Sequence, residues 1–141
     1  MVQLEPDVAA GLADDDRALI LAGLEPPPAL DVAGVAQRLH GEPHPWNLLT
    51  TPAGPRFIDF ENCARGPIEY DLASVPTRVS RCYRDADQDL VDACRRVVLA
   101  LVAAHRWHRD DRHPSGRQSG LDYLRALHVG PPWPGLDDVH W

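Results

Sequence analysis

Residues 40–60 read HGEPHPWNLLTTPAGPRFIDF, and this stretch decides how the rest of the chain is interpreted. Its first part contains two prolines one residue apart, a spacing that excludes a regular helix or a central strand. We therefore expect residues 40–47 to form a loop. Leu48–Thr50 and Arg56–Phe60 are short extended runs separated by the turn sequence PAGP, so they are predicted to pair as a β-hairpin.

The chain turns helical after this hairpin. Gly66-Pro67 is a typical helix start, and the helix is expected to end near Pro76. A long amphipathic helix follows, with a predicted capping box at Asp85 and Gln88. Its apolar positions recur at spacings of four and three residues, namely Leu90, Cys94, Val97, Leu101 and Ala104. Ser119 is expected to cap a last short helix.

The composition predicts a single domain with a real core. The chain has 141 residues, of which 44% are hydrophobic and 25% charged. We expect a fold of the α+β class, mainly α, over residues 1–141. The predicted order is an N-terminal helical segment (1–30), the loop and hairpin (35–62), a helical region (66–128) and an irregular tail (129–141).

Charge and hydropathy exclude several classes of partner. The net charge is −7 and basic residues form no cluster, so we expect no nucleic-acid partner. The longest apolar run, Val97 to Ala104, is far shorter than the roughly 20 residues that span a bilayer, so we expect no membrane partner. The first residues lack the pattern of a signal peptide, which favours a cytoplasmic location. The three cysteines, Cys63, Cys82 and Cys94, show no C-x-x-C spacing and are expected to be buried and reduced.

Polar residues follow one another along the loop and hairpin in an order that suits phosphoryl transfer. Glu42 offers a carboxylate that can accept the proton of an attacking hydroxyl group. Asn47 follows five residues later, and Asp59 stands on the other side of the hairpin. Magnesium prefers oxygen ligands, which amide and carboxylate side chains supply. This spacing is typical of the catalytic loop and metal ligands of phosphoryl transferases.

The segments HGEPHPWNLL, RFIDFEN and GPIEYDLA resemble, in this order, the aminoglycoside phosphotransferase family, which is related to choline kinases. The resemblance is clear over residues 35–76. It implies the C-terminal lobe of a protein-kinase-like fold, with a small hairpin that carries the metal ligands. It also implies that Glu42 is the catalytic base, where the family usually has aspartate, and that Asn47 and Asp59 bind the metal.

Three further residues take roles from the same resemblance. His40 and Asp71 match positions that support the catalytic loop, and Glu61 matches a second acid that would assist the metal. The implied reaction moves the γ-phosphoryl group of ATP to a hydroxyl of a small molecule, with Mg²⁺ or Mn²⁺ as cofactor. The acidic net charge would suit a cationic acceptor, which is expected to lie between the loop and the later helices.

Two features depart from the family. Glu42 is one methylene longer than aspartate, which moves its carboxylate by roughly 1.5 Å. The family's N-terminal lobe supplies a nucleotide-covering loop and a lysine for the phosphates, whereas this sequence contains no lysine. We therefore expect a C-terminal lobe with the N-terminal lobe absent, which is incomplete as an enzyme. Such a lobe would expose an apolar face that favours self-association or pairing with a separate N-terminal lobe.

Two other interpretations remain open at this point. The chain could be a non-catalytic remnant that binds a metal or a partner, or a metal-dependent hydrolase that uses His40, Glu42 and His44. In the favoured interpretation, His44 packs within the loop and Trp46 fills the core beneath it.

Overall fold

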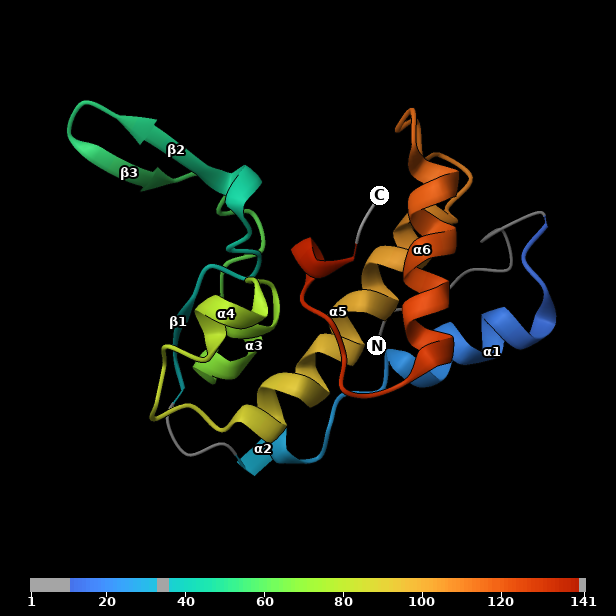
Figure 1. The fold of residues 1–141 in the computed structure, drawn as a ribbon, viewed down its shortest axis with the longest axis horizontal. Helices are drawn as coiled ribbons and strands as arrows, with labels where there is room; N and C mark the ends of the chain where they lie inside the picture. The colour runs from blue at the N-terminus through green and yellow to red at the C-terminus, as the bar shows by residue number, and fades with distance from the viewer. Residues whose placement is uncertain (1–10, 33–35, 140–141) are drawn as a thin grey trace.

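The computed structural model of this chain describes residues 11–32 and 36–139. The described part is mixed α and β and mainly helical, which is compatible with a fragment of a kinase-like fold (Figure 1). The helical piece expected around Pro6 lies outside the described residues. In chain order the elements are α1 (Asp14–Gly23), α2 (Ala29–Val32), β1 (Gln37–Leu39), the 3-10 helix η1 (Pro45–Asn47), β2 (Leu48–Thr51), β3 (Gly54–Phe57), β4 (Ala64–Gly66), α3 (Ile68–Ala73), α4 (Thr77–Ser80), α5 (Gln88–Arg106), α6 (Gly116–Val129) and the 3-10 helix η2 (Leu136–Asp138).

Helix α5 is the centre of the fold, and α1, α3 and α6 pack against it. Four of its five predicted apolar positions are buried, and Leu101 is half-buried. The helix begins later than the expected capping box. Asp87 is the N-cap and accepts hydrogen bonds from the backbone of Asp89 and Leu90 at 3.0 and 3.1 Å. Gln88 is the first helical residue, so the cap assigned to Asp85 and Gln88 is wrong.

Close packing around α5 depends on small side chains. A Cβ atom on Gly23 of α1 would lie 2.7 Å from that of Ala100, so only glycine allows this approach of α1. Helix α6 contacts both α1 and α5 and contributes Tyr123, Leu124 and Leu127 to the core. Helix α6 begins at Gly116 and is longer than expected, because Ser119 is a buried residue within it and not its cap.

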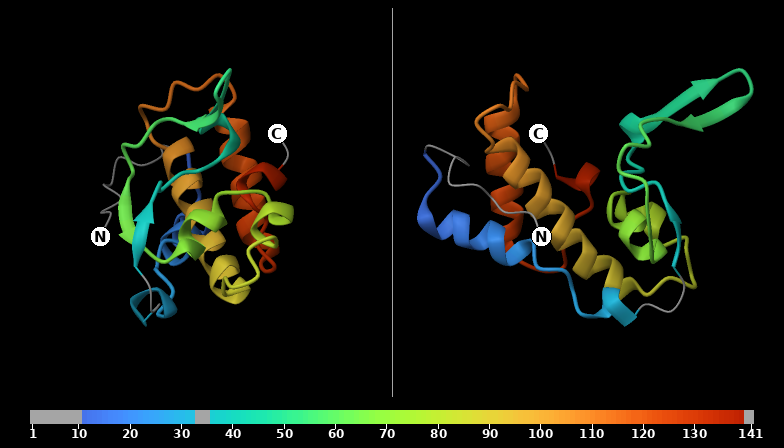
Figure 2. Two further views of the ribbon diagram at one scale, coloured as in Figure 1. Left: turned by 90° about the vertical axis from the view of Figure 1, so that its left-hand side faces the viewer. Right: turned by 180° about the vertical axis from the view of Figure 1, so that it is seen from behind.

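Two small antiparallel sheets carry the strands. The predicted hairpin is present and projects away from the helices (Figures 1 and 2). Its second strand is Gly54–Phe57 and not Arg56–Phe60 as expected, because the chain turns at Pro52 and Ala53 and pairing begins at Gly54. The second sheet joins β1 to β4 with Leu39 opposite Ala64. The sequence analysis did not predict β4. This second pairing brings the chain back to the start of the loop, so it fixes both ends of the segment that holds the candidate site.

Several side chains that were expected to be buried are exposed. Trp46 is 79% exposed and does not fill the core, because it belongs to a 3-10 turn at the surface. Cys63 and Cys82 are also exposed, and only Cys94 is buried as predicted. Large apolar side chains of the loop and hairpin lie at the surface as well: Leu48, Leu49, Phe57, Ile58 and Phe60. Within residues 11–32 and 36–139, no helix combines the length and apolar character that crossing a lipid bilayer requires.

Candidate functional site

The loop that begins at His40 is held by the carboxylate of Asp71 in α3. Asp71 Oδ2 accepts a hydrogen bond from the backbone N–H of His40, and Oδ1 accepts one from Gly41, both at 2.9 Å. Gly41 has a φ of 91°, in the region that favours glycine. A Cβ atom there would also overlap the backbone carbonyl of Asn62. A carboxylate and a glycine thus fix where the loop leaves β1.

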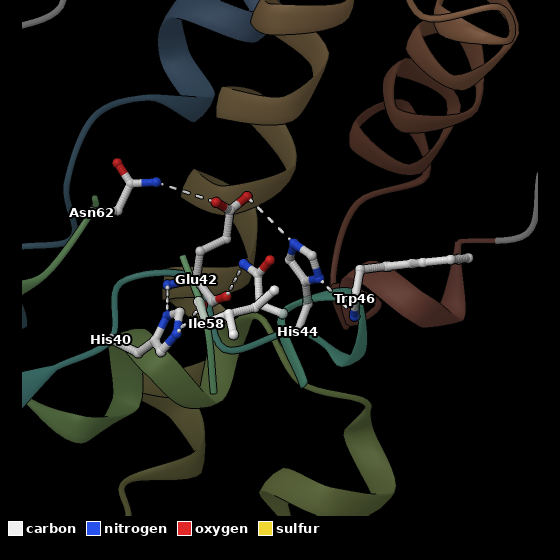
Figure 3. A network of polar contacts seen from close by, with 7 residues as sticks. His40, Glu42, His44, Trp46, Ile58 and Asn62 are labelled. Carbon is white, nitrogen blue, oxygen red and sulfur yellow. Dashed lines mark hydrogen bonds and ion pairs between the residues drawn. The ribbon is translucent and has the colours of Figure 1, made fainter. Parts of the chain in front are cut away.

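The imidazole of His40 joins the loop to the end of the hairpin. Its Nδ1 accepts a hydrogen bond from the backbone N–H of Glu42 at 3.4 Å. In the neutral ring this places the proton on Nε2, which donates to the carbonyl of Ile58 at 2.9 Å (Figure 3). The ring also lies 5.2 and 4.7 Å from the rings of Phe57 and Phe60. Both nitrogens of His40 therefore have partners in the backbone.

Asn47 is buried at the start of the hairpin, and its contacts fix the orientation of its amide. The Nδ2 atom donates to the backbone carbonyl of Glu42 at 3.0 Å, which closes the loop across five residues. Its own backbone carbonyl accepts from Ile58 at 2.9 Å. Because the amide nitrogen is engaged, the Oδ1 oxygen is the atom of this side chain that suits a hard cation.

The carboxylate of Glu42 lies between two side chains from different parts of the chain. Asn62 Nδ2 donates to its Oε2 at 3.2 Å, and His44 Nε2 lies 3.7 Å from its Oε1 (Figure 3). His44 Nδ1 accepts from the backbone N–H of Trp46 at 3.2 Å, so a neutral ring carries its proton on Nε2, toward Glu42. The two contacts orient a side chain that is 38% exposed.

Asp59 follows the hairpin directly. The backbone N–H of its neighbour Ile58 donates a hydrogen bond to the backbone carbonyl of Asn47. Asp59 therefore lies at the same end of the hairpin as Asn47. Asp59 has a φ of 62°, a left-handed conformation that is uncommon outside glycine but is tolerated by aspartate and asparagine. Within the described residues its exposed carboxylate has no hydrogen-bond partner, and Glu61 is exposed two residues further on.

Asn47 and Asp59, at this end of the hairpin, offer the oxygen ligands that a magnesium ion prefers. Asn47 offers an amide oxygen and Asp59 a carboxylate that is not engaged elsewhere, and both are ligands suited to a hard cation. The alternative site made of His40, Glu42 and His44 does not fit a zinc or iron ion. Both nitrogens of His40 are engaged, and no three His, Cys, Asp or Glu side chains of the described residues form a metal-binding group.

A pocket of about 460 Å³ opens beside Glu42. Glu42, His44 and Trp46 form one wall, and the other walls come from α5, α6, the segment between them and η2. The residues of these other walls are Val102, Arg106, His113, Ser115, Ser119, Tyr123, Leu136 and Asp137. The pocket therefore lies between the loop and the later helices, and its volume suits a small organic molecule.

The loop residues Glu42 and His44 act electrostatically on Tyr70 of α3 and on Asp137 of the pocket wall. Burial raises the pKa of Tyr70, and the charges of Cys94, Glu42 and Asp71 raise it further. Burial also raises the pKa of Asp137; electrostatic interactions with His44 and Arg78 oppose this shift, while Asp138 adds to it.

The mainly helical fold is compatible with a fragment of a kinase-like fold, and the comparison with family models points to the phosphotransferases. This chain belongs to the phosphotransferase enzyme family, whose model matches residues 3–82, more than half of its length. The match includes the loop, the hairpin and Asp71, and it ends before α5. Neither a search of curated proteins nor a search of solved structures found a match.

Sequence reasoning did not identify several residues of the site. The sequence analysis did not predict a role for Asn62, Arg106 or Asp137. Each lies far along the chain from Glu42, and no local pattern marks it. His44 was singled out, but its contact with Glu42 was not foreseen, because the turn at Pro45 sets the direction of its ring.

Proposed function

We propose that this chain transfers the γ-phosphoryl group of ATP to a hydroxyl group of a small molecule, with Mg²⁺ as cofactor and Mn²⁺ as a substitute. Membership of the phosphotransferase enzyme family supports the class of reaction. The observation that carries the proposal is the position of the Glu42 carboxylate, which is oriented by His44 and Asn62 at the edge of a pocket.

Glu42 acts as the base in this proposal. Phosphoryl transfer depends mainly on positioning and on electrostatic stabilisation, so the base has to orient the hydroxyl and accept its proton. The contacts with His44 and Asn62 restrict the extra rotatable bond that glutamate has compared with aspartate. Asp71 and His40 support the base indirectly, because they hold the backbone of the loop.

Asn47 and Asp59 hold the metal ion in this proposal, with Glu61 as a further acid nearby. Bound magnesium would neutralise charge on the phosphate oxygens. The 141 residues contain no lysine, so the phosphate-binding lysine that the resemblance implies has no counterpart among them. We therefore expect this chain to bind ATP weakly by itself. The exposed apolar side chains of the hairpin support contact with a separate N-terminal lobe or with a second copy.

The experiment that tests this function is a transfer assay with ATP labelled on the γ-phosphate. The chain is incubated with Mg²⁺ and, one at a time, with small alcohols, amino alcohols, hydroxy acids and hydroxyamino acids. The proposal expects label in the organic product of at least one class, in proportion to the ADP formed. Release of inorganic phosphate alone, at a rate independent of the added hydroxyl compound, would contradict it.

A further inference from the structure

The outer edge of strand β2 carries backbone groups that the hairpin does not use. Thr50 of β2 lies opposite Pro55 of β3. Because proline has no N–H to exchange, this pair is of the type without hydrogen bonds between its two residues. The N–H of Ile58 donates to the carbonyl of Asn47 at 2.9 Å, and bonded and non-bonded pairs alternate along an antiparallel ladder, which gives the same result. The N–H and C=O of Thr50 therefore point away from β3.

Leu48 lies on the same edge, two residues before Thr50, so its carbonyl points to the same side. Its N–H is already bonded to the carbonyl of Pro45. Among the described residues, β2 pairs with β3 alone, and the hairpin projects away from the helices (Figures 1 and 2). The open edge thus presents one donor, the N–H of Thr50, and a carbonyl acceptor two residues away.

The two edges of the hairpin differ in how they are protected. Folded proteins usually blunt an edge strand with proline or with charged side chains. Pro55 interrupts the outer edge of β3, whereas β2 has the sequence LLTT, with neither proline nor charge. A strand can therefore add to β2 and not to β3. Pairing through one edge closes at two copies, because no second edge is left to recruit a third.

The side chains of the hairpin favour a partner of the same kind. Leu48, Leu49 and Phe57 are exposed, and a hairpin of two strands is only marginally stable without further strands or a packed face. Residues 48–57 contain no acidic side chain, and their one charge is Arg56, although the whole chain has a net charge of −7. Two copies that meet at their hairpins therefore keep their acidic surfaces out of the contact.

We propose that two copies of this chain pair through β2 and form a dimer with a continuous four-stranded antiparallel sheet. With Leu49 opposite Leu49 of the second copy, the N–H of Thr50 in each chain donates to the carbonyl of Leu48 in the other. The N–H of Leu48, which is already bonded, is not needed. A second copy, and not a separate N-terminal lobe, is thus the partner of the hairpin. The dimer goes beyond the proposed function and does not depend on it.

The first test measures the oligomeric state of the whole chain, without ATP or metal, by light scattering and sedimentation over a range of concentrations. The expected result is a dimer that dissociates on dilution. A chain that stays monomeric at millimolar concentration overturns the proposal. Assembly that grows without limit also overturns it, because the edge interrupted by Pro55 would then be pairing as well.

The second test compares Thr50→Pro with Thr50→Val. Proline removes the donor of the open edge but leaves the β2–β3 ladder intact, whereas valine keeps the donor and a branched side chain. The dimer dissociation constant should rise at least about tenfold in Thr50→Pro and stay unchanged in Thr50→Val. An equal change in both variants, or no change in Thr50→Pro, overturns the proposal.

Leu49→Lys keeps the proposal testable if Thr50→Pro fails to fold, which thermal unfolding would show. It places two like charges opposite each other at the contact and should also dissociate the dimer. Val129→Lys is the matched control, because Val129 is an exposed apolar residue of α6 outside the hairpin. Dissociation by both lysine variants alike, or by neither, overturns the proposal.

The third test locates the contact by cross-linking. Residues in a non-bonded antiparallel pair have Cα atoms about 4.5 Å apart, which a disulfide can bridge. Mild oxidation should therefore convert Leu49→Cys into a covalent dimer much faster than Val129→Cys or the wild type, which controls for the exposed Cys63 and Cys82. Equal rates in the three proteins overturn the proposal. None of these measurements involves phosphoryl transfer, so their failure would leave the proposed function unchanged.

Discussion

Asn62 donates a hydrogen bond of 3.2 Å to the carboxylate of Glu42, although twenty residues separate them in the chain. The contact exists because the segment after the hairpin returns against Gly41, where only a glycine leaves room for the carbonyl of Asn62. With His44 on the other oxygen, the glutamate carboxylate has a defined position at the edge of the pocket. The length of this side chain is thus matched to its neighbours.

Replacing Glu42 by the residue usual in the family should therefore impair this chain. In Glu42→Asp the carboxylate withdraws by roughly 1.5 Å and loses both contacts. A misplacement of this size can reduce the rate about a hundredfold, so we expect kcat to fall by about that factor with little change in unfolding temperature. The measurement is phosphoryl transfer under saturating substrate, with Glu25→Asp as a control for shortening an exposed acid outside the site. Equal or higher kcat in Glu42→Asp would show that the two contacts do not position the base.

The loop and hairpin could be predicted from sequence, whereas the surroundings of Glu42 could not. Two closely spaced prolines and the PAGP turn are local signals, and they define the loop and β2–β3. The pairing of Leu39 with Ala64 has no such signal, because it joins segments twenty-five residues apart. Trp46 was misplaced for a related reason: an apolar side chain favours burial, but the 3-10 turn directs it to solvent.

Asp59→Asn should weaken the binding of Mn²⁺ without weakening the fold. The carboxylate is exposed and has no partner among the described residues, and asparagine tolerates the same left-handed backbone. We expect affinity for Mn²⁺ to fall about tenfold or more, since the change removes a negative charge from the proposed ligand set. Calorimetric titration and thermal unfolding would be measured on the variant, with Asp85→Asn as control. An unchanged Mn²⁺ affinity would remove Asp59 from the site.

Asp138 should make the stability of the chain depend on pH. Burial acts to raise its pKa, but hydrogen bonds from Thr77 and Gly135 and the charge of Arg95 outweigh burial and hold the pKa below its usual value. A group of this kind stabilises the fold above the pKa of the unfolded chain, about 3.9, and this stabilisation is lost as pH falls through the lower folded value.

The free energy of unfolding should therefore fall more steeply with acid in the wild type than in Asp138→Asn. The variant should also be less stable at neutral pH, because the carboxylate binds both the backbone N–H and the hydroxyl of Thr77 at 3.1 and 2.7 Å. Urea unfolding between pH 3 and 7 checks both expectations. Parallel pH profiles for the two proteins would exclude this role.

The two exposed cysteines should react with thiol reagents much faster than the buried Cys94. Burial, and to a smaller extent the charge of Glu69, raises the pKa of Cys94 to about 12, so it carries little thiolate at pH 8. Cys63 and Cys82 are exposed. A thiol reagent added to the native protein should modify these two rapidly and Cys94 only on unfolding. Mass spectrometry after a short exposure identifies the modified residues, and rapid labelling of Cys94 in the native state would contradict the packing of α5.

The most direct test of the central claim, that Glu42 is the base of a phosphotransferase, compares the wild type with Glu42→Gln. Glutamine keeps the length and an oxygen for Asn62 but cannot accept the substrate proton. Transfer of the γ-phosphoryl group from ATP to a hydroxyl compound accepted by the wild type is followed by phosphorus NMR. The account predicts a phosphorylated product in amounts equal to ADP for the wild type, and a rate lowered at least a hundredfold in Glu42→Gln. Transfer at the same rate in both proteins would contradict it.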